Sequence, residues 1–208
     1  MSHPRIAVFG SSTVRPGDAA YALGLALGRA LAAAGAEVAT GGYSGTMEAV
    51  SRGAHEAGGH VVGVTTELFE PRGPANRWVK ERLHTAHLYE RLQQLIENAQ
   101  GFVVLPGSLG TLTELFLAWT LVSVDGRPRV PIVLLGEHWP GFLEALRHPD
   151  MVLPGLFEHV EVASDAEDAA RRALRGAGAA TASDDATAAG GNLPSPSGAS
   201  SGREGGRR

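Results

Sequence analysis

The stretch 102–114, with the sequence FVVLPGSLGTLTE, constrains the fold more than any other part of this chain. Its first four residues are apolar and partly β-branched, which is typical of a strand buried on both faces. Pro106 ends that strand, and Gly107 and Gly110 permit close approaches that a side chain would block. A helix is expected to begin near Gly110 or Thr111. The stretch therefore predicts a strand, a tight turn and a helix.

The same alternation runs along most of the chain. Short apolar runs predict strands at residues 5–9, 37–40, 60–65, 102–105, 130–135 and 159–162. Helical spacing of apolar residues predicts helices at residues 18–34, 46–57, 83–98, 111–124, 139–147 and 165–174. Residues 67–80 are rich in proline, glycine and charge, and we expect a loop there. The pattern predicts a doubly wound, Rossmann-like α/β fold, with a mainly parallel sheet and helices on both faces.

Composition sets the extent of the folded part. The chain is 43% hydrophobic and 19% charged, which fits one globular domain over residues 1–175. Residues 176–208 are rich in glycine, alanine, serine and proline, with almost no large apolar side chains. Such a segment cannot bury enough surface to offset the entropy of ordering it. We therefore expect a disordered C-terminal tail.

Several classes of protein are disfavoured. The formal net charge is -4 with no basic stripe, so a nucleic-acid partner is not indicated. The chain has no cysteine, which excludes disulfides, a thiol nucleophile and a thiolate metal site. No apolar run approaches a membrane span, and the first strand follows without a leader sequence. We expect a cytoplasmic protein that needs no metal or cofactor and binds no membrane.

Three turns of small residues each follow an expected strand, at residues 10–13, 41–45 and 106–111. In an open α/β sheet such turns lie at one edge, where ligands bind. The first N–H groups of a helix lack partners and favour an anion. We expect a nucleotide-sized crevice with its phosphate on the last turn; the alternative is that the turns are only short connections. No dinucleotide fingerprint or ATPase phosphate loop is present.

Two charged residues are candidates for chemistry. Glu114 lies one turn into the helix after the last of these turns. In the alternative, Thr111 and Glu114 form a helix capping box and only bond the backbone. Arg91 lies on the expected helix 83–98, and its guanidinium could grip a phosphate or a carboxylate. In the alternative, it is a surface residue paired with Glu90.

Histidines and a methionine offer weaker signals. His84 and His87 have helical spacing and could join a metal site, but solvent-exposed histidines are the preferred interpretation. Met47 follows the second turn, where it could contact a ligand or fill the core. Lys80 is the only lysine in the chain, and it lies in the expected loop.

Two motifs together resemble the LOG family, long described as possible lysine decarboxylases. They are Gly41-Gly42-x-x-Gly45-x-Met47 and Pro106-Gly107-x-x-Gly110-Thr111-x-x-Glu114, and the resemblance covers about residues 6–138. Several members are cytokinin riboside 5′-monophosphate phosphoribohydrolases. The family's upstream arginine falls on Arg91 and its motif glutamate on Glu114. Ser108 replaces the second motif glycine, Leu92 replaces the lysine after the arginine, and Tyr43 and Thr46 interrupt the first motif.

The resemblance implies a Rossmann-like homodimer that binds AMP-like ligands. It implies hydrolysis of the N-glycosidic bond of a purine nucleoside 5′-monophosphate, including N6-modified AMP, with Arg91 and Glu114 as the catalytic residues. The alternative is a nucleotide-binding or nucleotide-sensing protein without catalysis. The expected substrate-binding and phosphate-binding residues are Gly10, Ser11, Ser12, Gly41, Gly42, Gly45, Met47, Gly107, Ser108, Gly110 and Thr111. Helices 83–98 and 111–124 are apolar enough to contribute a dimer face.

Overall fold

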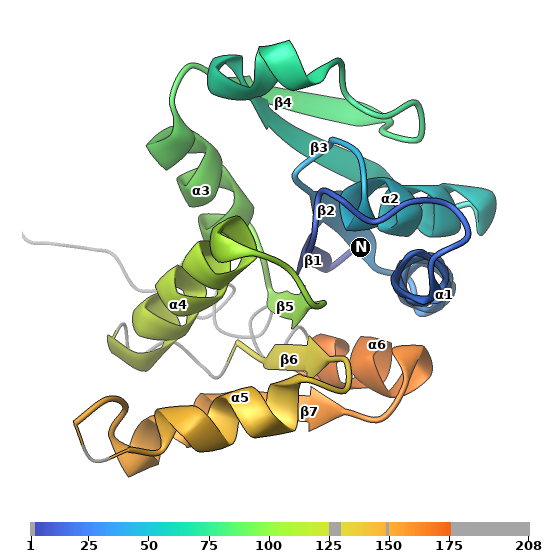
Figure 1. The fold of residues 1–208 in the computed structure, drawn as a ribbon. Coiled ribbons are helices and arrows are strands. Elements are labelled where there is room, and N and C mark those ends of the chain that lie inside the picture. The colour runs from blue at the N-terminus through green and yellow to red at the C-terminus, as the bar shows by residue number, and fades with distance from the viewer. Residues whose placement is uncertain (1–2, 125–129, 149, 176–208) are drawn as a thin grey trace, which may run out of the picture.

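A computed structural model describes residues 3–124, 130–148 and 150–175 of the chain. The predicted tail, 176–208, lies outside the described residues. Seven strands form one sheet in the order β4-β3-β2-β1-β5-β6-β7, and every adjacent pair is parallel (Figure 1). The predicted Rossmann-like α/β class is therefore confirmed. The strands are β1 (Arg5–Phe9), β2 (Glu37–Thr40), β3 (Val61–Thr66), β4 (Glu81–Thr85), β5 (Gly101–Val104), β6 (Ile132–Leu135) and β7 (Val160–Ala163).

Helices cover both faces of this sheet (Figure 1). One face carries α1 (Ala19–Ala33), α2 (Thr46–Glu56) and α6 (Ala166–Leu174). The other carries α3 (Leu88–Glu97), α4 (Leu109–Val124) and α5 (Trp139–Leu146). Two short 3-10 helices, η1 (Glu67–Arg72) and η2 (Pro154–His159), complete the elements.

The alternation of side chains along the central strands divides the core in two. In β1, Ile6 and Val8 pack toward α1, α2 and α6, whereas Ala7 and Phe9 pack toward α3, α4 and α5. All four side chains are at most 2% exposed. Burial on both faces explains why the central strands read as continuous apolar runs.

The sequence interpretation was wrong for residues 81–85. A helix was expected from residue 83, but Glu81–Thr85 form the edge strand β4, and α3 begins only at Leu88. Strand β4 is paired with β3 alone, so most of its side chains remain exposed and its pattern carries little apolar signal. Pairing with the edge of the sheet therefore decides this segment, and a local pattern does not report it.

Two smaller expectations also change. The expected loop 67–80 contains η1 in its first half. Helix α4 begins at Leu109, before the expected start. The helical spacing also predicts that Phe116 is buried, but it is 37% exposed. The Phe116 ring stacks with Trp119 and also contacts Phe142 of α5, each at a centroid distance of 6.2 Å.

Strand order reverses between β1 and β5, because the chain leaves β1 toward β2 and leaves β5 toward β6. The turns after these two strands therefore diverge and leave a crevice at the carboxyl edge of the sheet. Within the described residues, no helix has the length and apolarity to cross a membrane.

Candidate active site

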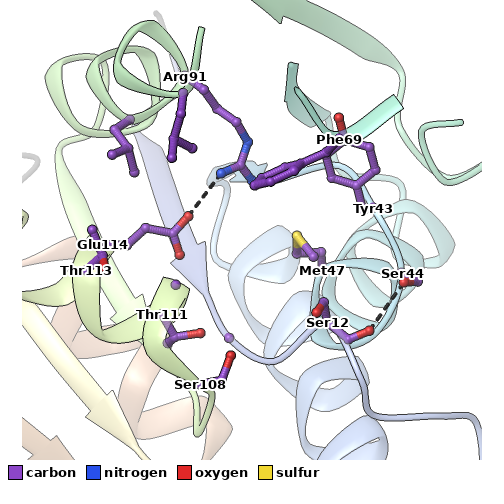
Figure 2. A pocket seen from close by; sticks show the side chains of 14 residues that line it. Ser12, Tyr43, Ser44, Met47, Phe69, Arg91, Ser108, Thr111, Thr113 and Glu114 are labelled. Atoms are coloured by element: carbon purple, nitrogen blue, oxygen red, sulfur yellow. Dashed lines mark hydrogen bonds and ion pairs between the residues drawn. The ribbon is translucent and has the colours of Figure 1, made fainter. Parts of the chain in front are cut away.

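A cavity of about 500 Å³ opens at this edge of the sheet (Figure 2). It draws residues from the segments that follow β1, β2, β3, β4 and β5. Eight of the predicted site residues line it: Gly10, Ser12, Met47, Arg91, Ser108, Gly110, Thr111 and Glu114. The small turns therefore share one cavity, and their role in binding a ligand stays a prediction.

The remaining predicted residues do not line the cavity, but they hold the turns around it close together. Ser11 joins two turns, since its N–H donates to the Pro106 carbonyl at 3.2 Å and its carbonyl accepts from Thr46 N–H at 2.8 Å. A Cβ on Gly107 would come within 2.1 Å of Thr111 Oγ1. A Cβ on Gly45 would come within 2.4 Å of the Ser11 carbonyl oxygen. These glycines let the turns approach one another.

The amino end of α4 faces the cavity. The first helical hydrogen bond runs from Leu112 N–H to the Ser108 carbonyl at 3.1 Å, so the N–H groups before it have no acceptor within the helix. Thr111 is 3% exposed, yet it lines the cavity and its hydroxyl bonds to none of the described residues. This end of α4 therefore offers unpaired donors and a positive dipole to an anion.

The capping-box alternative for Glu114 is wrong. Because α4 starts at Leu109, Thr111 lies inside its first turn and cannot be the N-cap residue. The Glu114 carboxylate instead accepts from Arg91 Nη1 at 3.3 Å (Figure 2). A side chain on α4 thus meets one from α3 across the cavity.

Arg91 is buried, with only 5% of its surface exposed, so the surface alternative is wrong as well. Its Nε donates to the Val64 carbonyl at 2.8 Å, which fixes the guanidinium over the end of β3. Glu90 turns the other way and accepts from the N–H groups of Ala86 and His87, at the start of α3. Arg91 therefore pairs with Glu114 rather than with Glu90, and its side chain lines the cavity.

Gly41 has a specific steric reason to be glycine. A Cβ at this position would lie 2.0 Å from Arg91 Nη2 and 2.6 Å from the sulfur of Met47. The guanidinium therefore rests against the backbone of the β2–α2 turn. Among the described residues, Nη2 makes no hydrogen bond, so it can donate to a ligand in the cavity.

Burial sets the protonation of Glu114. Its side chain is 12% exposed, and removal from water raises the pKa of the carboxyl above the ordinary value of 4.5. The positive charge and hydrogen bond of Arg91 lower this pKa in opposition, without cancelling the effect of burial. A carboxylate with a raised pKa in a cavity is suited to accept and return a proton.

Sequence reasoning missed six residues of the cavity wall: Tyr43, Ser44, Phe69, Leu88, Leu92 and Thr113. Leu88 and Leu92 were expected on the buried face of helix 83–98, and Leu92 was also noted as the residue in place of the motif lysine. Phe69 lay in the expected loop, where its aromatic ring in a charged, proline-containing segment was the one available signal. Its ring lies beside the Arg91 guanidinium, with Cζ 5.6 Å from the ring centroid (Figure 2).

The cavity offers no histidine ligands for a metal. His84 lies on β4 and His87 precedes α3, so the two do not share a helix face. Within the described residues, the one group with suitable ligand atoms is Glu37, His60 and Glu81. These residues lie where β2, β3 and β4 begin, at the edge opposite the cavity, and Arg5 already pairs with Glu37.

Fold and cavity define this chain as a Rossmann-like α/β protein with a cavity where its strand order reverses. A family model described as "Possible lysine decarboxylase" matches residues 47–173, which is more than half of the chain. The chain therefore belongs to this family, the LOG family.

Curated relatives carry the name of an enzyme. The cytokinin riboside 5′-monophosphate phosphoribohydrolase of Mycobacterium tuberculosis is 35% identical over 136 residues, 63% of this chain and 72% of that protein. Its namesake from Mycobacterium marinum is 40% identical over 123 residues, 59% of this chain and 64% of that protein. An Arabidopsis thaliana enzyme of the same name is 33% identical over 90 residues, only 40% of its own length.

Solved structures show the same fold. A molybdenum cofactor binding protein from Rippkaea orientalis superimposes with a TM-score of 0.62 at 25% identity, covering 81% of this chain and 93% of that one. The molybdenum cofactor carrier protein of Chlamydomonas reinhardtii gives a TM-score of 0.60 at 24% identity, over 85% and 99% of the two chains. The second likeness shows the fold alone.

The decarboxylase wording of the family description does not fit the cavity. Pyridoxal phosphate enzymes hold their cofactor as a Schiff base on lysine. Lys80 is the only lysine of the sequence, and it is not among the residues that line the cavity. Its backbone N–H bonds to the Val61 carbonyl at the far end of β3.

Proposed function

We propose that this protein hydrolyses the N-glycosidic bond of a purine nucleoside 5′-monophosphate, N6-modified AMP included, to the free base and ribose 5-phosphate. The observation that carries the proposal is the buried Arg91–Glu114 pair, which shares one cavity with the amino end of α4. The names of the mycobacterial relatives support the same activity.

The phosphate binds at the turn from Gly107 to Thr111. Unpaired N–H groups of α4 and the Thr111 hydroxyl donate to its oxygens, and the helix dipole stabilises its charge. Ser108 adds a second hydroxyl at the mouth of the same turn, which the family motif fills with glycine. Together these donors select a monophosphate ester over the uncharged nucleoside.

Glu114 carries the chemistry of bond cleavage. As the bond between C1′ and the base nitrogen breaks, the electron pair leaves with the base and positive charge builds on the ribose. The Glu114 carboxylate stabilises that charge and takes a proton from water, whose oxygen forms the new bond to C1′. The departing base gains a proton, and Glu114 returns its own to solvent. Arg91 holds Glu114 in position and donates to the ribose hydroxyls or the phosphate.

The base contacts apolar side chains that line the cavity, namely Met47, Phe69 and Leu92. These side chains are apolar, so they accept a purine ring and disfavour a charged group. Leu92 stands where the family motif has a lysine, which leaves Arg91 as the one cationic side chain among the described lining residues.

The test is incubation of the purified protein with AMP and with N6-isopentenyl-AMP, followed by chromatography for the free base. We expect release of base from at least one substrate, abolished by Glu114→Ala. Binding of a nucleotide without release of base would favour a non-catalytic carrier or sensor. If the protein neither binds a nucleotide nor releases a base, that result contradicts the proposal altogether.

We further propose a homodimer. Large apolar side chains are exposed along α4 and beside it, including Leu109 at 79%, Val124 at 73% and Leu153 at 68%. Tyr89 on α3 is also exposed, at 85%. A second copy would cover this surface. Light scattering on the eluted protein measures the mass directly, and a monomer at micromolar concentration would contradict the homodimer.

A cytoplasmic location is part of the same proposal. It rests on the phosphorylated substrate, which a cell keeps inside its membrane. Fractionation of the native host measures it.

A further inference from the structure

The segment between β3 and β4 forms part of the cavity, although it looks like an ordinary connection. Its helix η1 carries Phe69, which meets Tyr43 from the β2–α2 turn edge to face, with ring centroids 6.0 Å apart. Both residues line the cavity. We refer to Tyr43 and Phe69 as the aromatic wall (Figure 2).

One end of the aromatic wall is fixed through the Tyr43 hydroxyl. It donates to the Thr66 carbonyl and accepts from Thr66 N–H, each at 3.0 Å. Thr66 immediately precedes η1, so this pair of bonds joins the β2–α2 turn to the start of the segment that carries Phe69.

The backbone of Tyr43 is fixed by Asn76, which does not line the cavity. Its Nδ2 donates to the carbonyls of Gly42 at 3.1 Å and Tyr43 at 3.0 Å, and its backbone N–H donates to Gly42 at 2.8 Å. Its Oδ1 accepts from Trp78 N–H at 3.2 Å, which fixes the direction of the amide. Gly42 has φ +78, so this turn holds a conformation that only external bonds and glycine make favourable.

We propose that Asn76 is a positioning residue for the site. Resting on the proposed function, it holds the Gly42–Tyr43 turn so that the aromatic wall faces the base of the nucleotide. The hydrogen bonds of Arg91 run to Val64 and to Glu114, and among the described residues none runs to the Gly42–Tyr43 turn. Loss of Asn76 therefore weakens nucleotide binding more than it slows the chemical step.

The decisive variant is Asn76→Asp, which keeps the shape of the side chain but turns the donor Nδ2 into an acceptor facing two carbonyls. The matched control is Asn98→Asp at the end of α3, where Nδ2 also donates to a carbonyl, that of Gln94 at 3.1 Å. We expect KM for AMP to rise about tenfold in the first variant, with kcat changed less than threefold, and neither to change in the control.

A second variant tests the wall without changing Asn76. Tyr43→Phe removes the bonds to Thr66 and should also raise KM. If the bonds of Asn76 and of the Tyr43 hydroxyl hold the same aromatic wall, the changes in KM will not be additive in the variant that carries both substitutions. This variant also serves if Asn76→Asp does not fold.

The outcomes separate the two proposals. An active wild type with equal KM in the Asn76 and Asn98 variants overturns the role of Asn76 and leaves the enzyme intact. The role of Asn76 is also overturned if the two variants lose kcat to the same extent and melting temperature to the same extent. Such losses would report only a general effect on the structure. A wild type that binds AMP without cleaving it overturns the hydrolase, and calorimetric Kd values then test Asn76. A wild type that does neither overturns both.

Discussion

Two arginine–carboxylate clusters in this protein have opposite properties. In the cavity, Glu114 has one donor among the residues that the structure describes, Arg91 at 3.3 Å, and burial raises the pKa of the carboxyl. On α6, Asp168 accepts from Arg172 at 2.7 Å, from Arg171 at 2.5 Å and from Ser164 N–H at 3.2 Å. The Ser164 N–H above all, and then the arginines, hold the pKa of Asp168 below its ordinary value.

The difference lies in how many donors each carboxylate receives. Asp168 is saturated with donors, so it stays ionised and ties β7 to α6. Glu114 is left with one long contact and is largely buried, so its proton affinity is increased. An arginine partner alone therefore does not define a structural salt bridge. The donors that are missing mark the carboxylate that is available for chemistry.

The largest expected effect comes from Glu114→Gln. We expect base release to fall by about 10²- to 10⁴-fold, because the amide cannot take a proton from water. The melting temperature should stay level or rise, since a buried charge is removed. Initial rates and scanning calorimetry measure the two quantities. If Glu114→Gln retained turnover, Glu114 would not be the carboxylate that carries the chemistry, and its contrast with Asp168 would fail.

Gly41→Ala tests whether the Arg91–Glu114 geometry matters. The new Cβ would lie 2.0 Å from Arg91 Nη2 and must displace the guanidinium. We expect about a 10²-fold lower rate, the order of loss for a displacement of about 1 Å at a catalytic group. Gly141→Ala on α5 is the control, because nothing lies within 4 Å of its Cβ position. Equal rates in the two variants would contradict this account.

Asp168→Asn tests the other member of the comparison. Two arginines and the Ser164 N–H lose a charged acceptor, so we expect the melting temperature to fall by a few degrees. The kinetic constants for base release should match those of the wild type, since neither Asp168 nor its arginine partners line the cavity. A loss of activity at a temperature where the variant is folded would show that the clusters are not independent.

The smallest expected effect is the dependence of stability on pH, which should have opposite signs at the two sites. The raised pKa of Glu114 means that the folded state binds a proton more tightly, so its contribution to stability falls as pH rises above about 4.5. The lowered pKa of Asp168 gives a contribution that is present above 3.8 and is lost as pH falls through the folded pKa.

Melting curves across this pH range measure both contributions. The difference between Glu114→Gln and wild type should grow with rising pH, whereas the deficit of Asp168→Asn should shrink in acid. The rate of base release should also decline in acid at a higher pH than an ordinary glutamate would give. Parallel changes in the two variants would contradict the assignment of opposite shifts.

Much of the fold was predictable from the sequence because its signals are local. The buried run 102–105 and the glycines after it report a strand and a turn through their nearest neighbours alone. The helix that follows is equally local, and so is the placement of Glu114 one turn into it. The resemblance to the LOG family then singled out Arg91, which its helical position alone had not.

The tertiary structure decided what depends on segments distant in sequence. Strand β4 exists because β3 offers it an edge, although its own residues carry a weak pattern. Arg91 meets Glu114 because α3 and α4 lie on the same face of the sheet and converge at its carboxyl edge. Phe69 lines the cavity, and Asn76 bonds to the β2–α2 turn, because the β3–β4 segment folds back over that turn. Periodicity records only a residue's nearest neighbours, whereas strand order brings distant side chains into contact, and strand order is a property of the whole chain.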